Sequence, residues 1–164
     1  MKQLSEKYKI TTPSKSANLE IIRDFVGKLA RRAGFSEDHV NKIQLATDEA
    51  CTNVVKHAYK NVPAGPIEVD VTLNREKFVV TVSDKGIGFD LNNLVQPNMV
   101  EYLNQYKKGG LGIHLIQTLM DEVVFKVNPF HKNSVKMVKY IHRSESADKL
   151  RQQKMIMERT KNRG

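Results

Sequence analysis

The alternation of apolar and polar residues near the start of the chain predicts one strand and then a helix. Residues 8–12 alternate with the period of a strand, and Pro13 ends this segment. The apolar positions that follow recur every three or four residues, as on one face of a helix: Leu19, Ile22, Phe25, Val26 and Leu29. We expect Ser16 to cap this helix at its start and Gly34 to end it.

A second helix is predicted from Ser36 onward. Ser36 is a suitable N-cap residue, and Glu37 and Asp38 fall in the first turn, where the helix dipole favours negative charge. The apolar positions of this helix are Val40, Ile43, Leu45, Ala46, Ala50, Val54 and Ala58. Glu49 and Asn53 interrupt the apolar pattern four residues apart, which puts both side chains on one face of the helix.

Two alternating segments in the middle of the chain predict a β-hairpin. Residues 67–73 and residues 78–82 each have apolar side chains at every second position. The polar residues Asn74, Arg75 and Glu76 lie between them and are suited to a turn. These two segments are therefore expected to pair as antiparallel strands.

The rest of the chain completes an α+β pattern. Residues 89–108 are mostly polar and predict a long loop with a short helix, of a length that is usually functional. A helix is expected over 111–120, opened by glycines, followed by strands over 123–127 and 134–141. Helices gathered on one face of a largely antiparallel sheet form a two-layer α/β sandwich.

The length and composition fit one soluble domain. The chain has 164 residues, of which 40% are hydrophobic and 27% charged, and we place the domain at residues 1–142. Residues 143–164 are a charged tail, expected to be a solvated extension rather than a terminal helix. Neither a membrane span nor a signal peptide is predicted, and the lone cysteine, Cys51, fits a reducing cytoplasm and a buried thiol.

The formal net charge of +9 raises nucleic acid as a partner. The basic residues are spread along the whole chain, and no helix-turn-helix, zinc-finger or RNA-binding signature accompanies them. An acidic protein or a polyphosphate explains the charge at least as well. Direct nucleic-acid binding is kept as the minority alternative.

Three segments carry residues that a hydrophobic core does not require. The first holds Glu49 and Asn53, and the second is the D-x-G-x-G segment of Asp84, Gly86 and Gly88, which follows a strand. The third is K-G-G-L-G at residues 108–112, directly before a helix, whose N-terminus favours an anion. Each segment alone has a structural alternative: a solvated helix face, a strand-ending loop or a flexible linker. Neither a P-loop nor a G-x-G-x-x-G dinucleotide motif is present.

Taken in this order, the three segments resemble the Bergerat-fold ATP site shared by histidine kinases and type II topoisomerases. A narrower resemblance is to the anti-sigma-factor serine/threonine protein kinases. It is carried by TPSKSANLEIIRDFVGKLARRAGF, DEACTNVVKHAYK, GGLGIHLIQTLMDEV and SVKMVKYI, and it covers roughly residues 8–142.

The resemblance implies a role for each site residue. Asn53 would bind the Mg²⁺ that bridges the ATP phosphates, and Glu49 would accept the proton of the attacking hydroxyl. Asp84 would accept a hydrogen bond from the adenine amino group, while Gly86 and Gly88 let the chain pass close to the base.

The resemblance also implies a lid over residues 90–108 and contacts to the phosphates. The residues expected to contact the phosphates are Lys108, Gly109, Gly110, Leu111 and Gly112. Ser134 stands where the family places a threonine near the adenine, and the turn before it, PFHKNS, lacks the glycine often found there.

The implied function is that of an anti-sigma factor and kinase. Such a protein sequesters a sigma factor of RNA polymerase and uses Mg-ATP to phosphorylate a serine or threonine of an anti-anti-sigma partner, a STAS-domain protein. The resemblance also implies a homodimer. Two alternatives are a binding module that uses ATP without catalysis and a switch kinase of the same family that activates a phosphatase. Glu49 favours catalysis, because sequestration alone needs no base.

Overall fold

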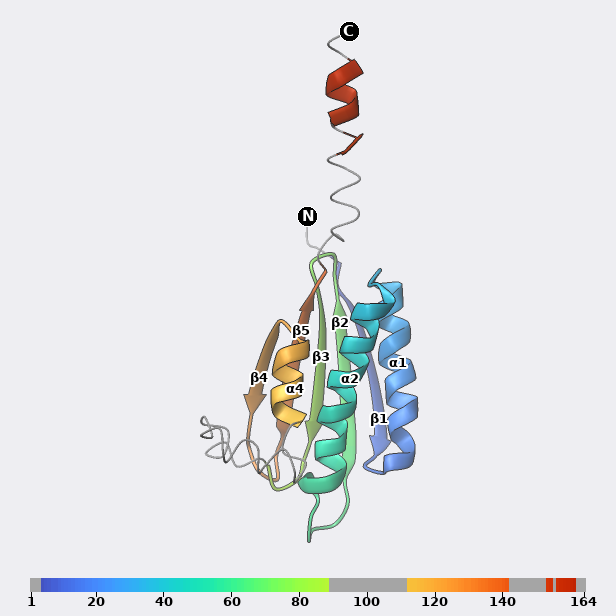
Figure 1. Ribbon diagram of the computed structural model, residues 1–164. Helices are drawn as coiled ribbons and strands as arrows, with labels where there is room; N and C mark the ends of the chain where they lie inside the picture. Colours follow the sequence, from blue (N-terminus) through green and yellow to red (C-terminus); the bar gives the residue numbers. More distant parts are fainter. Residues whose placement is uncertain (1–3, 89–111, 142–152, 155, 162–164) are drawn as a thin grey trace.

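Five strands form one sheet in the order β1-β2-β3-β5-β4, and every neighbouring pair is antiparallel. The computed structural model describes residues 4–88, 112–141, 153–154 and 156–161 (Figure 1). The strands are β1 (Glu6–Pro13), β2 (Pro66–Leu73), β3 (Lys77–Asp84), β4 (Glu122–Lys126) and β5 (Asn133–Tyr140). The predicted hairpin is confirmed as β2 and β3.

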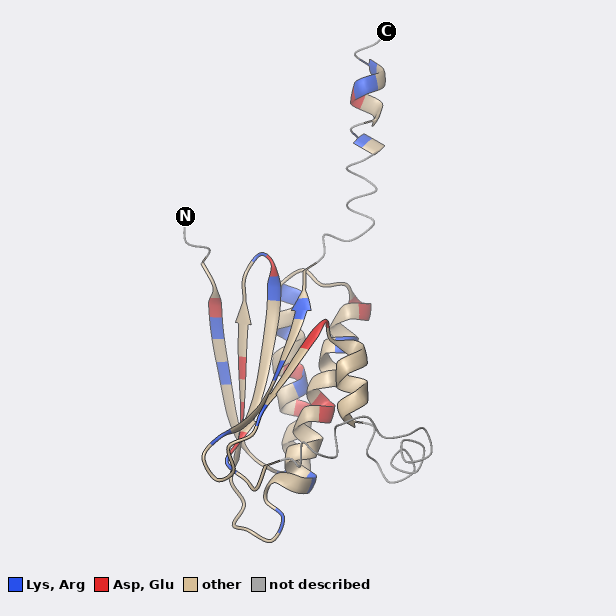
Figure 2. Ribbon diagram, turned by 90° about the vertical axis from the view of Figure 1, so that its left-hand side faces the viewer, with Lys and Arg blue, Asp and Glu red and all other residues tan. Residues whose placement is uncertain are grey.

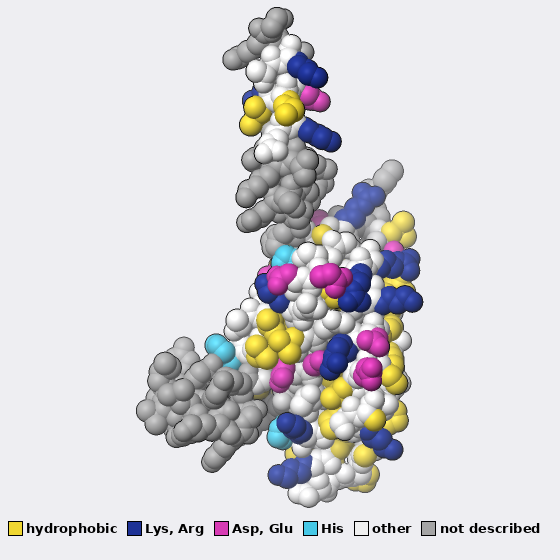
Figure 3. Space-filling view, turned by 45° about the vertical axis from the view of Figure 1, so that its right-hand side comes forward, with side chains coloured by type: hydrophobic (Ala, Val, Ile, Leu, Met, Phe, Trp, Pro, Cys, Tyr) yellow, Lys and Arg dark blue, Asp and Glu magenta, His cyan; other side chains and the backbone are white. Residues whose placement is uncertain are grey.

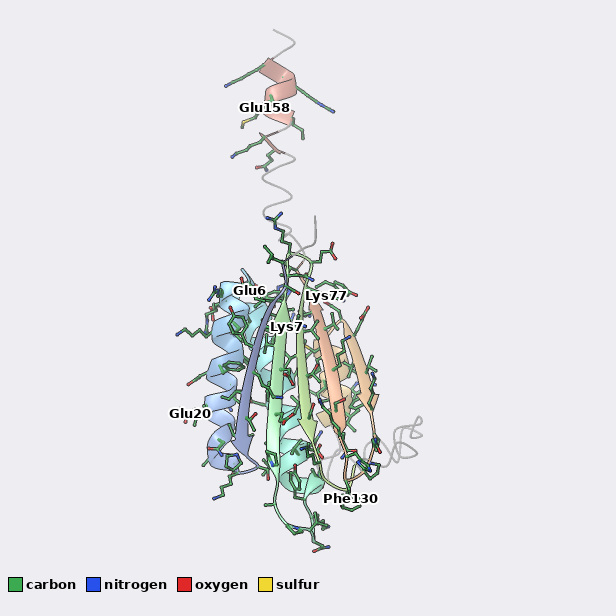
Figure 4. The ribbon with its side chains drawn as sticks, turned by 180° about the vertical axis from the view of Figure 1, so that it is seen from behind. Glu6, Lys7, Glu20, Lys77, Phe130 and Glu158 are labelled. Atoms are coloured by element: carbon green, nitrogen blue, oxygen red, sulfur yellow. The ribbon has the colours of Figure 1, made fainter. Side chains whose placement is uncertain are left out.

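The helices cover one face of this sheet. They are α1 (Leu19–Arg32), α2 (Glu37–Asn53) and α4 (Gly112–Leu119), with a short 3₁₀ turn at Ser16–Asn18 and a π-helical turn at Val54–Ala58. Helix α2 contacts both α1 and α4, and all three lie on the same side of the sheet (Figures 1 and 2). Among the described residues, no helix covers the opposite face, which Figure 4 shows from behind. The predicted two-layer α+β sandwich is therefore confirmed.

The core lies between the helices and the inward face of the central strands. The alternating residues Ile67, Val69 and Val71 of β2 are fully buried, as are Val40 and Ile43 of α2. Each such side chain stabilises the fold by about 1.5–3 kcal/mol relative to an exposed position. The period of two in the strands and of 3.6 in the helices thus fixes which faces meet.

The ends of the helices agree with the sequence prediction at two positions and differ at one. Ser36 caps α2 by accepting a hydrogen bond from the backbone N–H of His39 at 3.4 Å. Gly34 ends α1 with a φ of +95°, a left-handed conformation that glycine adopts without strain. The predicted cap at Ser16 is wrong: Ser16 begins the 3₁₀ turn, and Asn18 precedes α1 without a capping side-chain hydrogen bond.

Two other predictions are corrected. Leu45, placed in the core by the apolar pattern, is 42% exposed, because it lies on the side of α2 that faces away from the sheet. Strands β4 and β5 each begin one residue earlier than predicted, at Glu122 and Asn133. This difference changes only the bounds of the two strands, but it brings Asn133 into β5.

The tail is described only at residues 153–154 and 156–161, which are helical and exposed. Ile156 is 64% exposed, so the expected solvent exposure is confirmed for these residues. Their backbone is helical, which was not expected. The predicted domain boundary at residue 142 lies outside the described residues and stays a prediction. In the part of the chain that the structure describes, no helix is long and apolar enough to cross a membrane.

The buried thiol of Cys51 gives a prediction. Cys51 is fully buried in α2, and burial raises the pKa of its thiol from an ordinary value of 9.0 to about 12. We expect no reaction of the native protein with an aromatic disulfide reagent at pH 8, and one thiol per chain after unfolding in guanidinium. As pH rises above 9.0, the thiol ionises in the unfolded chain but stays protonated in the folded one. The free energy of unfolding should therefore fall between that pH and about 12. Rapid labelling of the native protein would contradict this placement.

Candidate functional site

The first two site residues, Glu49 and Asn53, meet the start of helix α4. Both side chains are half-buried on one face of α2. A Cβ atom built on Gly112 would lie 2.8 Å from Glu49 Oε2 and 3.4 Å from both the oxygen and the nitrogen of the Asn53 side chain. The structure therefore brings Gly112 together with two residues that lie far from it in the sequence.

Glycine at position 112 keeps this space open. Any larger residue would direct its side chain between the Glu49 carboxylate and the Asn53 amide. Gly112 is also the first residue of α4, where backbone N–H groups and the helix dipole favour an anion. A carboxylate, an amide oxygen and a helix N-terminus thus face one another.

The end of α2 is shaped by its π-helical turn. From Val54 to Ala58 the helix widens, which changes the direction of the last carbonyl groups. The Ala58 carbonyl accepts a hydrogen bond from the backbone N–H of Ile87 at 2.8 Å. A Cβ atom on Gly86 would lie only 1.9 Å from that carbonyl oxygen. Only glycine lets the loop after β3 approach α2 this closely.

Asp84 ends β3 with its side chain 4% exposed. Its Oδ1 atom accepts hydrogen bonds from the Gly86 backbone N–H at 2.8 Å and from Nδ2 of Asn133 at 3.0 Å. No described residue donates a hydrogen bond to the other carboxylate oxygen, Oδ2. One oxygen is fixed by the protein, and the second is left to accept a further donor.

The side chain beside Asp84 comes from Asn133, which the sequence prediction missed. Asp84 pairs with Asn133 across β3 and β5, whereas Ser134 pairs with Ser83. Successive residues of a strand point to opposite faces, so Ser134 and Ser83 share the face turned away from the helices. The structure places Asn133, and not Ser134, next to Asp84. Ser134 was expected from the resemblance alone, whereas the strand pairing gives the position beside Asp84 to Asn133.

The turn between β4 and β5 contacts the loop after β3. The Phe130 backbone N–H donates to the Gly86 carbonyl at 2.9 Å. Gly88 has a φ of +82°, and a Cβ there would lie 2.8 Å from Cγ1 of Val127 and 3.0 Å from Oδ1 of Asn133. The loop of Asp84, Gly86 and Gly88 therefore runs between the end of α2 and this turn.

Four predicted phosphate-contacting residues, Lys108, Gly109, Gly110 and Leu111, lie outside the described residues. The predicted lid at residues 90–108 lies outside them as well. Their roles stay predictions.

An ion pair connects α1 to the turn of α2 that carries Glu49. Arg23 Nε lies 2.7 Å from Asp48 Oδ2. Burial raises the pKa of the Asp48 carboxyl, while the Arg23 guanidinium opposes the rise. Oδ1 of Asp48 is buried and has no hydrogen-bond partner among the described residues. The pair links the two helices next to the site.

Comparison with known proteins supports a nucleotide site. Residues 12–139 match the family described as the histidine kinase-like ATPase domain. The serine-protein kinase RsbW of Bacillus cereus (strain AH187) is 35% identical over 149 residues, covering 88% of this chain and 91% of the relative. RsbW of Bacillus thuringiensis (strain Al Hakam) matches with the same values.

A solved structure has the same fold. It contains the RsbU and RsbW domains of Rv1364c from Mycobacterium tuberculosis, and it matches 82% of this chain and 32% of that longer chain. The TM-score is 0.60 at 16% identity, which supports the fold alone. From the family match and the extent of the sequence identity, the chain belongs to the histidine kinase-like ATPase domain family and, within it, to the RsbW serine-protein kinases.

Proposed function

We propose that this protein is an anti-sigma factor that sequesters a sigma factor and transfers the γ-phosphate of ATP to a serine or threonine of an anti-anti-sigma protein. The observation that supports this most directly is the meeting of Glu49 and Asn53 with the start of α4 at Gly112. The ATPase domain family implies ATP binding, and the RsbW relatives are serine-protein kinases. A pure sequestering module has no use for the carboxylate at this place.

The residues present fit Mg²⁺. The side chain of Asn53 offers a carbonyl oxygen near the Glu49 carboxylate. The space between them stays open because residue 112 is a glycine. Among the described residues, no group of three or more His, Cys, Asp or Glu side chains is placed to hold a metal. Mg²⁺ suits such a site, since it commonly takes one or two protein oxygens and completes its shell with phosphates and water. When bound, the ion neutralises charge on the phosphates.

Glu49 is the base in the proposed reaction. The partner's hydroxyl oxygen forms a bond to the γ-phosphorus, the bond from that phosphorus to the bridging oxygen breaks, and ADP leaves. The hydroxyl proton passes to the Glu49 carboxylate. Asn53 and the amides at the start of α4 hold the phosphates in line for this attack.

Asp84 is the proposed adenine-recognising residue. Its Oδ2, to which no described residue donates, would accept from the exocyclic amino group of adenine. Guanine carries a carbonyl oxygen at the equivalent position, which would face the carboxylate without a proton between them. Buried polar groups left unpaired cost more than a hydrogen bond gains, so the arrangement favours ATP over GTP.

The partners follow from the family. A sigma factor and an unphosphorylated anti-anti-sigma protein would compete for the kinase, and phosphorylation would release the latter. We propose that the protein works as a homodimer in the cytoplasm. On the face shown in Figure 3, acidic and basic side chains are interspersed, which does not favour a nucleic-acid surface there.

The first prediction concerns the base. Glu49→Gln keeps the shape of the side chain but removes the proton acceptor, so phosphoryl transfer should fall about 100- to 10,000-fold while ATP still binds. The measurement uses radiolabelled ATP, Mg²⁺ and the candidate anti-anti-sigma proteins of the host. The matched control is Glu37→Gln, in the first turn of the same helix, where the carboxylate pairs with Arg31.

Three results of this experiment have different meanings. Label on a serine or threonine of the partner that is lost in Glu49→Gln supports the kinase. Equal transfer by Glu49→Gln and the wild type would show that Glu49 is not the base. ATP binding without transfer to any partner favours the non-catalytic module, and transfer to a partner that regulates a phosphatase favours the switch kinase.

The second prediction concerns the space at the start of α4. Gly112→Ala introduces a methyl group 2.8 Å from the Glu49 carboxylate, which is the mobile end of a side chain and moves aside. Folding should be retained, and transfer should fall on the order of 100-fold because the base is displaced. Gly34→Ala is the control: its Cβ meets nothing within 4 Å, and its positive φ costs stability only. Full activity of Gly112→Ala would show that this space is not used.

A further inference from the structure

We propose that Asn133 is a positioning residue that orients the Asp84 carboxylate for adenine and so sets the preference for ATP over GTP. The inference rests on the proposed ATP site and deepens it. Asn133 is 1% exposed, begins β5 and pairs directly with Asp84 at the end of β3. The RsbW resemblance pointed instead to the neighbouring Ser134, which the strand register turns to the other face of the sheet.

Every hydrogen-bonding group of the Asn133 side chain except one lone pair is used. Its Nδ2 donates to Asp84 Oδ1 and to the Gly86 carbonyl, each at 3.0 Å. Its Oδ1 accepts from the backbone N–H of Asn128 at 3.0 Å. Asn133 thus connects the end of β3, the loop after it and the turn before β5.

This network permits only one orientation of the amide. If the side chain were rotated by half a turn, its oxygen would face two acceptors, the Asp84 carboxylate and the Gly86 carbonyl. Its nitrogen would then face the Asn128 N–H, which is a donor. Since both exchanges replace hydrogen bonds with repulsion, the amide holds its donor side toward Asp84.

A fixed amide in turn fixes the carboxylate. Asp84 Oδ1 receives one donor from its own loop, the Gly86 N–H, and a second from Asn133. Two donors on the same oxygen restrict rotation of the carboxylate about its Cβ–Cγ bond and leave Oδ2 as the acceptor for a ligand. Without Asn133 the carboxylate keeps only the Gly86 donor among the described residues, and its plane can turn away from the orientation that suits the nucleotide.

The same amide supports the loop on which the base would lie. The Gly86 carbonyl accepts from both Asn133 Nδ2 and the Phe130 N–H, while the next residue, Ile87, donates to the Ala58 carbonyl. The loop is therefore held from the sheet side and from the helix side at once. Loss of Asn133 would release one of these two supports.

The test is a double-variant cycle with Asp84. We expect Asn133→Ala to lower ATP affinity about 10- to 100-fold, the value of a hydrogen bond to a charged group, and to narrow the ratio of ATP to GTP affinity. Asp84→Asn should lower ATP affinity at least as much. If Asn133 acts through Asp84, the double variant should bind ATP no more weakly than Asp84→Asn alone. Titration calorimetry with ATP, GTP and Mg²⁺ measures all four proteins.

A second variant and a matched control separate positioning from folding. Asn133→Asp has the same shape but presents an acceptor to Asp84, so it should lose at least as much ATP affinity as Asn133→Ala. The control is Asn74→Ala: Asn74 Oδ1 accepts from the backbone N–H groups of Glu76 and Lys77 in the β2–β3 turn. Figure 4 shows Lys77 at the opposite end of the sheet from Phe130. Asn74→Ala should lower the midpoint of thermal unfolding without changing the ratio of ATP to GTP affinity.

The outcomes distinguish this inference from the proposed function. If Asp84→Asn binds ATP as the wild type does, the adenine-recognising role of Asp84 itself is wrong. If Asp84→Asn loses affinity while both Asn133 variants keep the affinity and the ATP preference, only the positioning role of Asn133 is wrong. Additive losses in the double variant would also overturn it, because they would mean that Asn133 acts independently of Asp84.

Discussion

The contact of the Gly86 backbone with the Ala58 carbonyl is the constraint on which the site depends. It joins the end of α2 to the end of β3, and the Ile87 N–H completes it with a hydrogen bond of 2.8 Å. Ala58 is the last residue of the π-helical turn, and the missing Cβ at Gly86 lets the loop reach its carbonyl. Because of this contact, the end of α2 and the end of β3, which carry the two sets of candidate site residues, are held next to each other.

The two parts of the proposed site are built differently. On the sheet side, Asp84 and Asn133 are buried in a hydrogen-bonded network that allows one arrangement only. On the helix side, Glu49 and Asn53 are half-buried and border the start of α4 without a fixed partner among the described residues. A rigid part suits recognition of a nucleobase, which has one shape. An adaptable part suits the proposed proton acceptor, which must meet a hydroxyl group of a second protein.

Local patterns in the sequence predicted most of the fold. The alternation in β2 and β3, the cap at Ser36 and the glycine at position 34 depend on neighbours in the chain, and all were correct. The candidate site residues on α2 and in the D-x-G-x-G loop were predicted from the order of the three motifs along the chain. The exposure of Leu45 and the place of Asn133 depend on which elements pack together and on strand register. Those are set by contacts between distant segments, so a local pattern does not specify them.

The network on the sheet side is centred on the carboxylate of Asp84. This residue is 4% exposed, and its Oδ1 accepts from two N–H donors, as a polar group that is buried requires. In the proposed site, an amino group of the ligand would donate to Oδ2, whereas a ligand with a carbonyl oxygen at that place would meet repulsion from the carboxylate. The proposed selectivity for an amino group over a carbonyl would therefore come from holding one oxygen with protein donors while the other accepts from the ligand.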